Sequence, residues 1–116
     1  MQEALRKKGI CTLKREQFNK IYNKGLFYSN KHLVIYVIKN LKNSNFYGIS
    51  ISKKVGNSVV RSRLRRLIKE SIRLSQHDIQ KGYNVIIVSR TKEDANFNFI
   101  DNSLKKLFVK AKMMKI

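Results

Sequence analysis

The chain has 116 residues, of which 42% are hydrophobic, so it is long and apolar enough for one folded domain and is not a disordered basic tail. Its 26 Lys and Arg residues against 7 Asp and Glu residues give a formal net charge of +19, which predicts a polyanion as its usual neighbour. A membrane is not expected to be that polyanion, because no apolar run approaches the length of a spanning helix and no signal peptide precedes the first helix. A single cysteine, Cys11, excludes an internal disulfide and a cysteine-based zinc cluster, and we expect a cytoplasmic protein.

The beginning of the chain predicts a short basic start followed by a helix. We expect residues 1–11 to be mobile and residues 13–24 to form the helix. Gly25 follows as a left-handed cap, the conformation in which helices commonly end. Phe18 and Tyr22 lie four residues apart and therefore share one face of this helix.

Three strands are predicted next. Residues 26–28 form a short strand, and residues 33–38 form a stronger one that is rich in β-branched residues and apolar on both faces. Such a strand should be covered on both sides, or line a groove on one side. Residues 40–45 read as a polar hairpin loop, and residues 46–52 form a third strand with clean alternation.

Residues 52–70 predict an unusually basic amphipathic helix. Asn57 or Ser58 can cap its N-terminus after the Val55–Gly56 turn. One apolar stripe recurs at helical spacing: Val60, Leu64, Leu67, Ile68, Ser71 and Ile72. The same spacing places a second set on the opposite side: Ser62, Arg65, Arg66, Lys69 and Arg73. Arg61 and Arg63 stand at the two edges of the stripe.

The charges of this helix do not compensate one another along the sequence. Four cations follow in steps of four without an interleaved acid: Arg61, Arg65, Lys69 and Arg73. Like charges at this spacing repel by a few tenths of a kcal/mol. Glu70, four residues after Arg66, relieves the other edge. We therefore expect the balancing negative charge to come from outside the chain.

The end of the chain predicts a further strand and helix. Residues 76–82 form a polar connection, residues 83–89 a strand, residues 90–96 a loop, and residues 97–113 a last helix with basic outer faces. The element order is αβββαβα in a single α+β domain spanning residues 1–116.

No catalytic constellation is found in the sequence. The seven acids are scattered, the two histidines are isolated, and no glycine-rich phosphate loop is present. We expect no catalytic residue and no metal site on the protein. The residues alone predict a binding protein.

Residues 50–70 strongly resemble the signature of the bacterial ribonuclease P protein subunit. They read Ser-Ile-Ser-Lys-Lys-Val-Gly-Asn-Ser-Val-Val-Arg-Ser-Arg-Leu-Arg-Arg-Leu-Ile-Lys-Glu. The resemblance extends upstream through residues 18–25 and 34–36, and downstream through residues 83–89 and the closing basic helix. It thus covers most of the chain, and the long central motif is its specific part.

The resemblance implies a fold and a function. The fold is a four-stranded sheet packed with helices in the order αβββαβα, with a left-handed crossover around the basic helix against the general right-handed rule. The function is to bind the catalytic RNA of ribonuclease P, one protein to one RNA, and to help it remove the 5′ leader of precursor tRNA. The RNA subunit, with Mg²⁺ bound mainly by that RNA, would perform the hydrolysis.

Carried over by position, the resemblance implies two sets of site residues. The contact surface for the RNA subunit comprises Lys53, Lys54, Arg61, Ser62, Arg63, Arg65, Arg66, Lys69 and Arg73. The aromatic lining of the cleft for the single-stranded leader comprises Phe18, Tyr22 and Tyr36. On structural grounds alone, the Phe18–Tyr22 pair reads as hydrophobic core, so both interpretations stay open.

One departure from the family pattern concerns the basic helix. The family usually has Arg-Asn-Arg where this chain has Arg61-Ser62-Arg63, so the contact made by position 62 is open. Two other classes also remain: a ribosomal or other structural RNA-binding protein of similar fold, and a basic DNA-binding module. The DNA-binding module is disfavoured because strands flank the basic helix, which leaves no helix-turn-helix pair.

Overall fold

A five-stranded sheet with helices on both faces forms the domain. The computed structural model describes residues 11–90 and 96–115, so the predicted mobile start lies outside the described residues except for Cys11. The elements are β1 (Cys11–Thr12), α2 (Arg15–Lys24), β2 (Leu26–Ser29), β3 (Leu33–Lys39), β4 (Phe46–Ile51), the 3₁₀ turn η1 (Lys53–Val55), α3 (Ser58–Ser75), the 3₁₀ turn η2 (Gln76–Asp78), β5 (Tyr83–Ser89) and α4 (Phe97–Lys110). The predicted order αβββαβα is confirmed for the helices and the four longer strands, and the two-residue β1 precedes it.

The strands are arranged in the order β1-β4-β5-β3-β2. Strand β3 is antiparallel to β2 and β5, whereas β4 is parallel to β5 and β1. The prediction of a hairpin over residues 40–45 is therefore wrong, because β5 lies between β3 and β4. The reason is burial: Val85, Ile86 and Ile87 are fully buried, and a strand that is apolar on both faces is favoured at the centre of a sheet. The left-handed sense of the β4–α3–β5 crossover stays a prediction from the resemblance.

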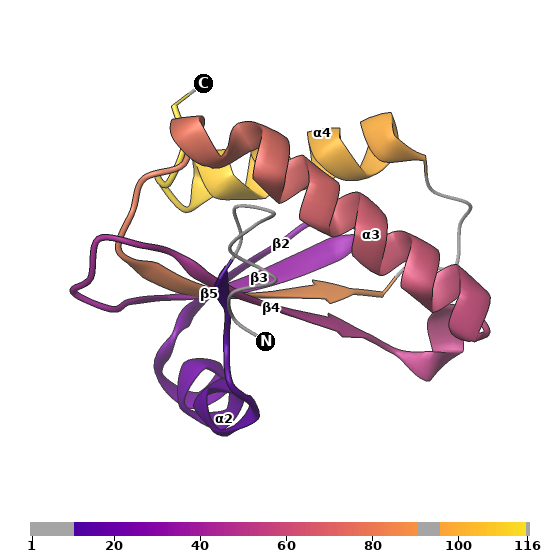
Figure 1. Ribbon diagram of the computed structural model, residues 1–116, viewed down its shortest axis with the longest axis horizontal. Helices are drawn as coiled ribbons and strands as arrows, with labels where there is room; N and C mark the ends of the chain where they lie inside the picture. Colours follow the sequence, from indigo (N-terminus) through magenta and orange to yellow (C-terminus); the bar gives the residue numbers. More distant parts are fainter. Residues whose placement is uncertain (1–10, 91–95, 116) are drawn as a thin grey trace.

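Two hydrophobic clusters cover the two faces of the sheet. Helices α3 and α4 lie on one face, and α2 crosses the other (Figure 1). The larger cluster joins Ile35 and Ile87 of the sheet to Ile68 of α3 and Phe108 of α4. The smaller one contains Leu13, Ile21 and Ile86, with half-buried side chains around them. Residues 33–38 are fully covered on the face of α3 and α4, whereas Tyr36 and Ile38 on the α2 face are only half-buried.

Helix α2 ends differently from the prediction. Gly25 has φ −76° and ψ 155°, an extended conformation and not a left-handed cap. The chain leaves the helix straight into β2, which starts at the next residue. A Cβ at Gly25 would lie 2.6 Å from the carbonyl oxygen of Ile21 and 3.0 Å from that of Val37. Glycine is needed here for this close approach of backbones.

The ends of α3 and α4 are set by specific hydrogen bonds. The side chain of Asn57 accepts a hydrogen bond of 3.0 Å from the Val60 N–H, which confirms a cap at the predicted place. Helix α4 stops before residue 113 because Lys112 adopts φ 61° and the Met113 N–H donates to the Phe108 carbonyl. This left-handed turn puts the Met113 side chain into the core.

Candidate nucleic-acid interface

The predicted apolar stripe of α3 is confirmed except at its first residue, Val60. Leu64, Ile68 and Ile72 are buried, whereas Val60 is 40% exposed. A Cβ at Gly56 would lie 2.9 Å from the Cβ of Val60, so Val60 packs on the turn that precedes the helix and not on the sheet. The stripe is centred on Leu64 and Ile68.

The cations of α3 divide into an exposed row and a half-buried flank. Ser62 and Arg66 are exposed, as predicted for the solvent side, and Arg63, which was predicted at an edge of the stripe, is exposed as well. The half-buried flank comprises Arg61, Arg65, Lys69 and Arg73. The expected position of Arg65 opposite the stripe is wrong, because its Nη1 donates to the carbonyl of Ile49 in β4 at 3.5 Å. The Nε of Arg61 is also buried and makes no hydrogen bond within the described chain.

Glu70 pairs with Arg73 and not with Arg66. Nε and Nη2 of Arg73 each donate a hydrogen bond of 2.8 Å to the Glu70 carboxylate. These hydrogen bonds lower the pKa of the Glu70 carboxyl and raise the pKa of Arg73. The expectation that Glu70 compensates Arg66 is therefore wrong. Neither Arg63 nor Arg66 forms an ion pair with any residue that the structure describes.

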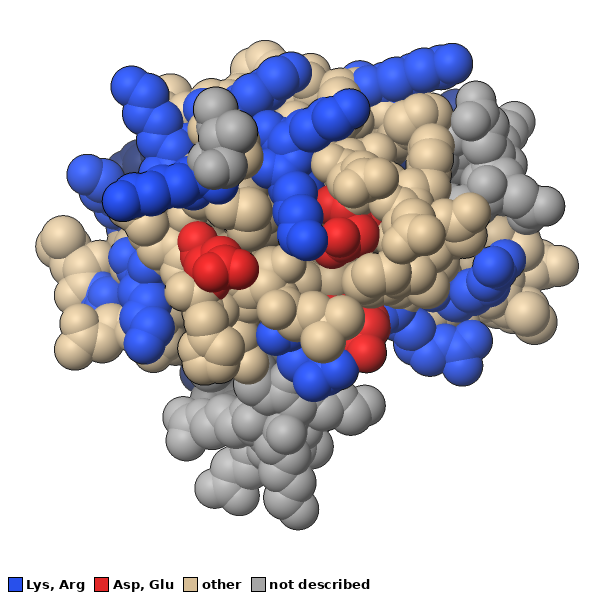
Figure 2. All heavy atoms as spheres, turned by 90° about the horizontal axis from the view of Figure 1, so that it is seen from above, with Lys and Arg blue, Asp and Glu red and all other residues tan. Residues whose placement is uncertain are grey.

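Two more predicted contact residues lie where β4 passes into α3. Lys53 and Lys54 are exposed in η1, and the Ser52 hydroxyl accepts a hydrogen bond of 3.2 Å from the Lys54 N–H. Figure 2 shows Lys and Arg side chains spread over the face formed by α3 and α4, with few acids among them. On α4, the ammonium of Lys105 pairs with Asp101 at 2.9 Å. The exposed face is strongly cationic.

The three predicted cleft aromatics are brought together on the opposite face, between α2 and the sheet. The ring centroids of Tyr22 and Tyr36 are 4.8 Å apart and those of Phe18 and Tyr22 are 6.3 Å apart, both edge-on. A fourth ring, that of Phe27, lies 6.0 Å from Tyr36 at an interplanar angle of 38°. We call Phe18, Tyr22, Tyr36 and Phe27 the aromatic row.

The aromatic row follows one line across the sheet. Phe18 lies directly over Gly48 of β4, where a Cβ would collide with its ring. Gly48, Ile86, Tyr36 and Phe27 are consecutive partners on β4, β5, β3 and β2. Phe18 and Tyr36 are half-buried against the smaller cluster, whereas Tyr22 is 37% and Phe27 65% exposed. Core packing and an open aromatic surface thus coexist in the same row.

Phe27 was missed by sequence reasoning. It falls in the predicted strand 26–28, but its closeness to Tyr36 depends on the pairing of β2 with β3. A sequence carries no direct signal for that register.

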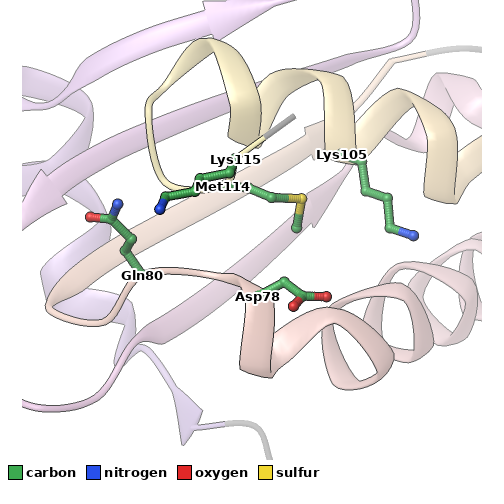
Figure 3. Close-up of a pocket in the computed structure, with 5 residues that line it drawn as sticks. All are labelled: Asp78, Gln80, Lys105, Met114 and Lys115. Atoms are coloured by element: carbon green, nitrogen blue, oxygen red, sulfur yellow. The ribbon is translucent and has the colours of Figure 1, made fainter.

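Two hollows are lined by residues other than those of the aromatic row. One, of about 530 Å³, lies beside the ends of α3 and α4 and is lined by Asp78, Gln80, Lys105, Met114 and Lys115 (Figure 3). The other, of about 400 Å³, lies beside the first turns of α2 and includes Lys20, Lys39 and Lys42. Both linings mix amide, charged and apolar side chains.

Within residues 11–90 and 96–115, no group of three His, Cys, Asp or Glu side chains is close enough to hold a metal ion. Over the same residues, no helix is both long and apolar enough to cross a membrane.

Comparisons with known proteins agree on one family. The family model described as Ribonuclease P matches residues 8–112. The "Ribonuclease P protein component" of Clostridium acetobutylicum is 48% identical over 101 residues, covering 84% of this chain and 85% of the relative. That of Clostridioides difficile is 45% identical over 96 residues, covering 81% and 84%.

Solved structures match over most of their length. The RNase P protein of Staphylococcus aureus superposes with a TM-score of 0.81 at 31% identity, covering 89% of this chain and 95% of the other. That of Thermotoga maritima gives a TM-score of 0.80 at 26% identity, covering 85% and 96%. The sequence, the family model and the fold agree: the chain belongs to the ribonuclease P protein family.

Proposed function

We propose that the protein binds the RNA subunit of ribonuclease P, one protein to one RNA, and holds the single-stranded 5′ leader of precursor tRNA. The RNA surface consists of η1 and α3, with the residues Lys53, Lys54, Arg61, Ser62, Arg63, Arg65, Arg66, Lys69 and Arg73. The leader surface consists of Phe18, Tyr22 and Tyr36 on the other face. Two separate surfaces suit a protein that holds a catalytic RNA and its substrate together.

The observation that carries the proposal is the exposure of Arg63 and Arg66 without an ion pair in the described chain, in a member of this family. Arginines neutralise phosphates and release counterions, which favours association and makes it dependent on salt. Half-exposed aromatic rings stack on bases without reading their sequence, which suits leaders of varied sequence. The protein supplies binding and orientation in this scheme.

The hydrolysis itself is assigned to the RNA subunit. Mg²⁺ would be held mainly by RNA phosphates there, because this ion prefers phosphate and other oxygen ligands. Mg²⁺ supplies charge stabilisation and an activated water when bound. The role of the cationic protein is to lower repulsion between the two RNAs, so its effect should be largest at low Mg²⁺.

The test is a reconstitution. Purified protein should leave precursor tRNA intact, and it should restore cleavage at low Mg²⁺ when ribonuclease P RNA is added. Ribosomal RNA offered in competition should bind more weakly than ribonuclease P RNA. Cleavage by the protein without an RNA partner would contradict the assignment of chemistry, and preference for ribosomal RNA would favour the structural RNA-binding class.

A further inference from the structure

Phe27 is an exposed aromatic side chain that contributes to neither hydrophobic cluster. It lies on β2, the edge strand of the sheet, and 65% of it is exposed. It belongs to neither hydrophobic cluster, and its one described ring contact is with Tyr36. A large apolar ring in this position offers its surface to something outside the described chain.

Phe27 continues the line of the aromatic row. It pairs directly with Tyr36 across the β2–β3 ladder, and directly paired residues place their side chains on the same face of the sheet. Its neighbour Leu26 pairs with Val37 and, by strand alternation, faces the other way. Exposure within the row is lowest at the half-buried Phe18 and Tyr36 and highest at Phe27. The ring most available for stacking is therefore the last one, at the edge of the sheet.

A cation is held at the same edge. The Nζ of Lys110, which comes from α4 on the opposite face, donates to the carbonyl of Ser29 at 3.4 Å. Ser29 is two residues beyond Phe27 on β2, and Lys110 is exposed. The edge strand thus carries an exposed aromatic ring and, two residues further along, a cation from the other face of the sheet. Base stacking and phosphate neutralisation are the two needs of an unpaired nucleotide.

We propose that Phe27 is a further stacking position for an unpaired nucleotide, so that the leader path runs beyond Tyr36 to the edge strand β2. The ligand is a single-stranded RNA segment, and the contact does not select a particular base. This inference rests on the proposed function. The inference extends the proposed leader surface from Tyr36 to Phe27 on the edge strand β2.

The chain offers a clean optical test because it contains no tryptophan. Phe27→Trp introduces a single indole, and we expect its fluorescence in the reconstituted holoenzyme to be quenched by precursor tRNA with a long leader but not by mature tRNA. Leu26→Trp is the matched control, since Leu26 is 68% exposed on the same strand but faces the other way. Equal responses from the two indoles, or none from position 27, would overturn the inference.

Affinity measurements test the same contact without a probe. Phe27→Ala should weaken holoenzyme binding of long-leader precursor tRNA by about 5- to 150-fold, the range of one lost base–aromatic stack. Phe27→Leu should lose most of the same affinity, because leucine is apolar but has no flat π-face. The loss should vanish for a leader trimmed to the length that reaches only Tyr36, and Leu26→Ala should bind like the unchanged protein.

The controls separate this inference from the proposed function. If Tyr36→Ala loses leader discrimination and Phe27→Ala does not, the leader surface stands but ends at Tyr36, and the inference is wrong. If neither variant changes leader binding, the leader surface itself is wrong. If Phe27→Ala instead converts a dimer into a monomer in sedimentation, with leader binding unchanged, the exposed edge is an interface between copies and the inference is overturned.

Discussion

The arginines of α3 differ in whether a carboxylate of the protein already neutralises their charge. Arg73 already shares its charge with Glu70 through two hydrogen bonds, whereas Arg66 forms no ion pair with a described residue. An RNA phosphate should bind Arg66 more favourably than Arg73, because no protein carboxylate has to be displaced from Arg66. Exposed single ion pairs are weak, so the difference should be visible mainly in salt dependence.

The first prediction compares these two residues. Arg66→Ala should reduce the slope of log K against log salt for binding to ribonuclease P RNA by about 0.7–0.9, whereas Arg73→Ala should reduce it by less. Glu70→Gln frees Arg73 and should steepen the slope. The measurement is a binding titration over a salt series. Equal slopes for Arg66→Ala and Arg73→Ala would show that the intramolecular pair does not govern RNA contact.

Tyr36 carries the second prediction. Its ring is half-buried and contacts Tyr22 and Phe27 from the open side, so truncation removes stacking surface more than core volume. Tyr36→Ala should weaken holoenzyme binding of leader-bearing precursor tRNA by an amount corresponding to about 1–3 kcal/mol, with mature tRNA binding nearly unchanged.

A thermal melt provides the control for Tyr36. A core role would instead cost about 3–5 kcal/mol of folding stability, which is typical of an aromatic residue cut to alanine. A large fall in melting temperature with leader discrimination intact would assign Tyr36 to the core alone.

At the scale of elements, the position of α2 depends on a missing side chain in β4. Phe18 occupies the space above Gly48, so the helix can lie close to the sheet and present its aromatic residues. Gly48→Ala, the third prediction, should push the Phe18 ring aside, lower stability by about 1–3 kcal/mol and weaken leader binding. Urea denaturation measures the first effect and holoenzyme titration the second.

The double variant Gly48→Ala with Phe18→Ala is the matched control for this prediction. Removing the ring makes room for the new methyl group, so the two changes should cost less together than the sum of the single changes. Strict additivity would mean that the ring and the glycine do not share this space.

The spacing of apolar residues was sufficient to predict the helices and strands, but not which strands lie next to each other in the sheet. The α+β order, the cap at Asn57 and the closeness of Phe18 to Tyr22 follow from local spacing, which a sequence shows directly. The insertion of β5 between β3 and β4 depends on contacts distant in sequence, and the local polar loop suggested a hairpin instead. The half-buried position of Arg65 depends on its contact with the carbonyl of Ile49 in β4, which is distant in sequence. Phe27 was missed for the same reason, because only the β2–β3 register places it beside Tyr36.

For the whole molecule, a net charge of +19 in a domain with a radius of gyration of 13.2 Å implies strong self-repulsion. The Debye length falls from roughly 30 Å at 0.01 M salt to about 10 Å at 0.1 M, below the size of the domain. The fourth prediction is that the free energy of unfolding rises over this salt range, measured by urea denaturation in sodium chloride. A flat profile would mean that the cations are spaced widely enough not to repel in the folded state.

Because β5 is central in the sheet, the surfaces of this protein can form only in a certain order during translation. β5 is the last of the described strands to leave the ribosome, and until it emerges β3 and β4 lack the strand that lies between them in the sheet. Tyr36, which contacts Tyr22, and Gly48, which lies under Phe18, are therefore brought into one surface only when residues 83–89 have been synthesised. A nascent chain that stops short of β5 already carries the whole basic helix α3 but not the assembled aromatic row. Under the proposed function, attraction to RNA would therefore precede the ability to hold a leader during synthesis, and β5 would complete the second property.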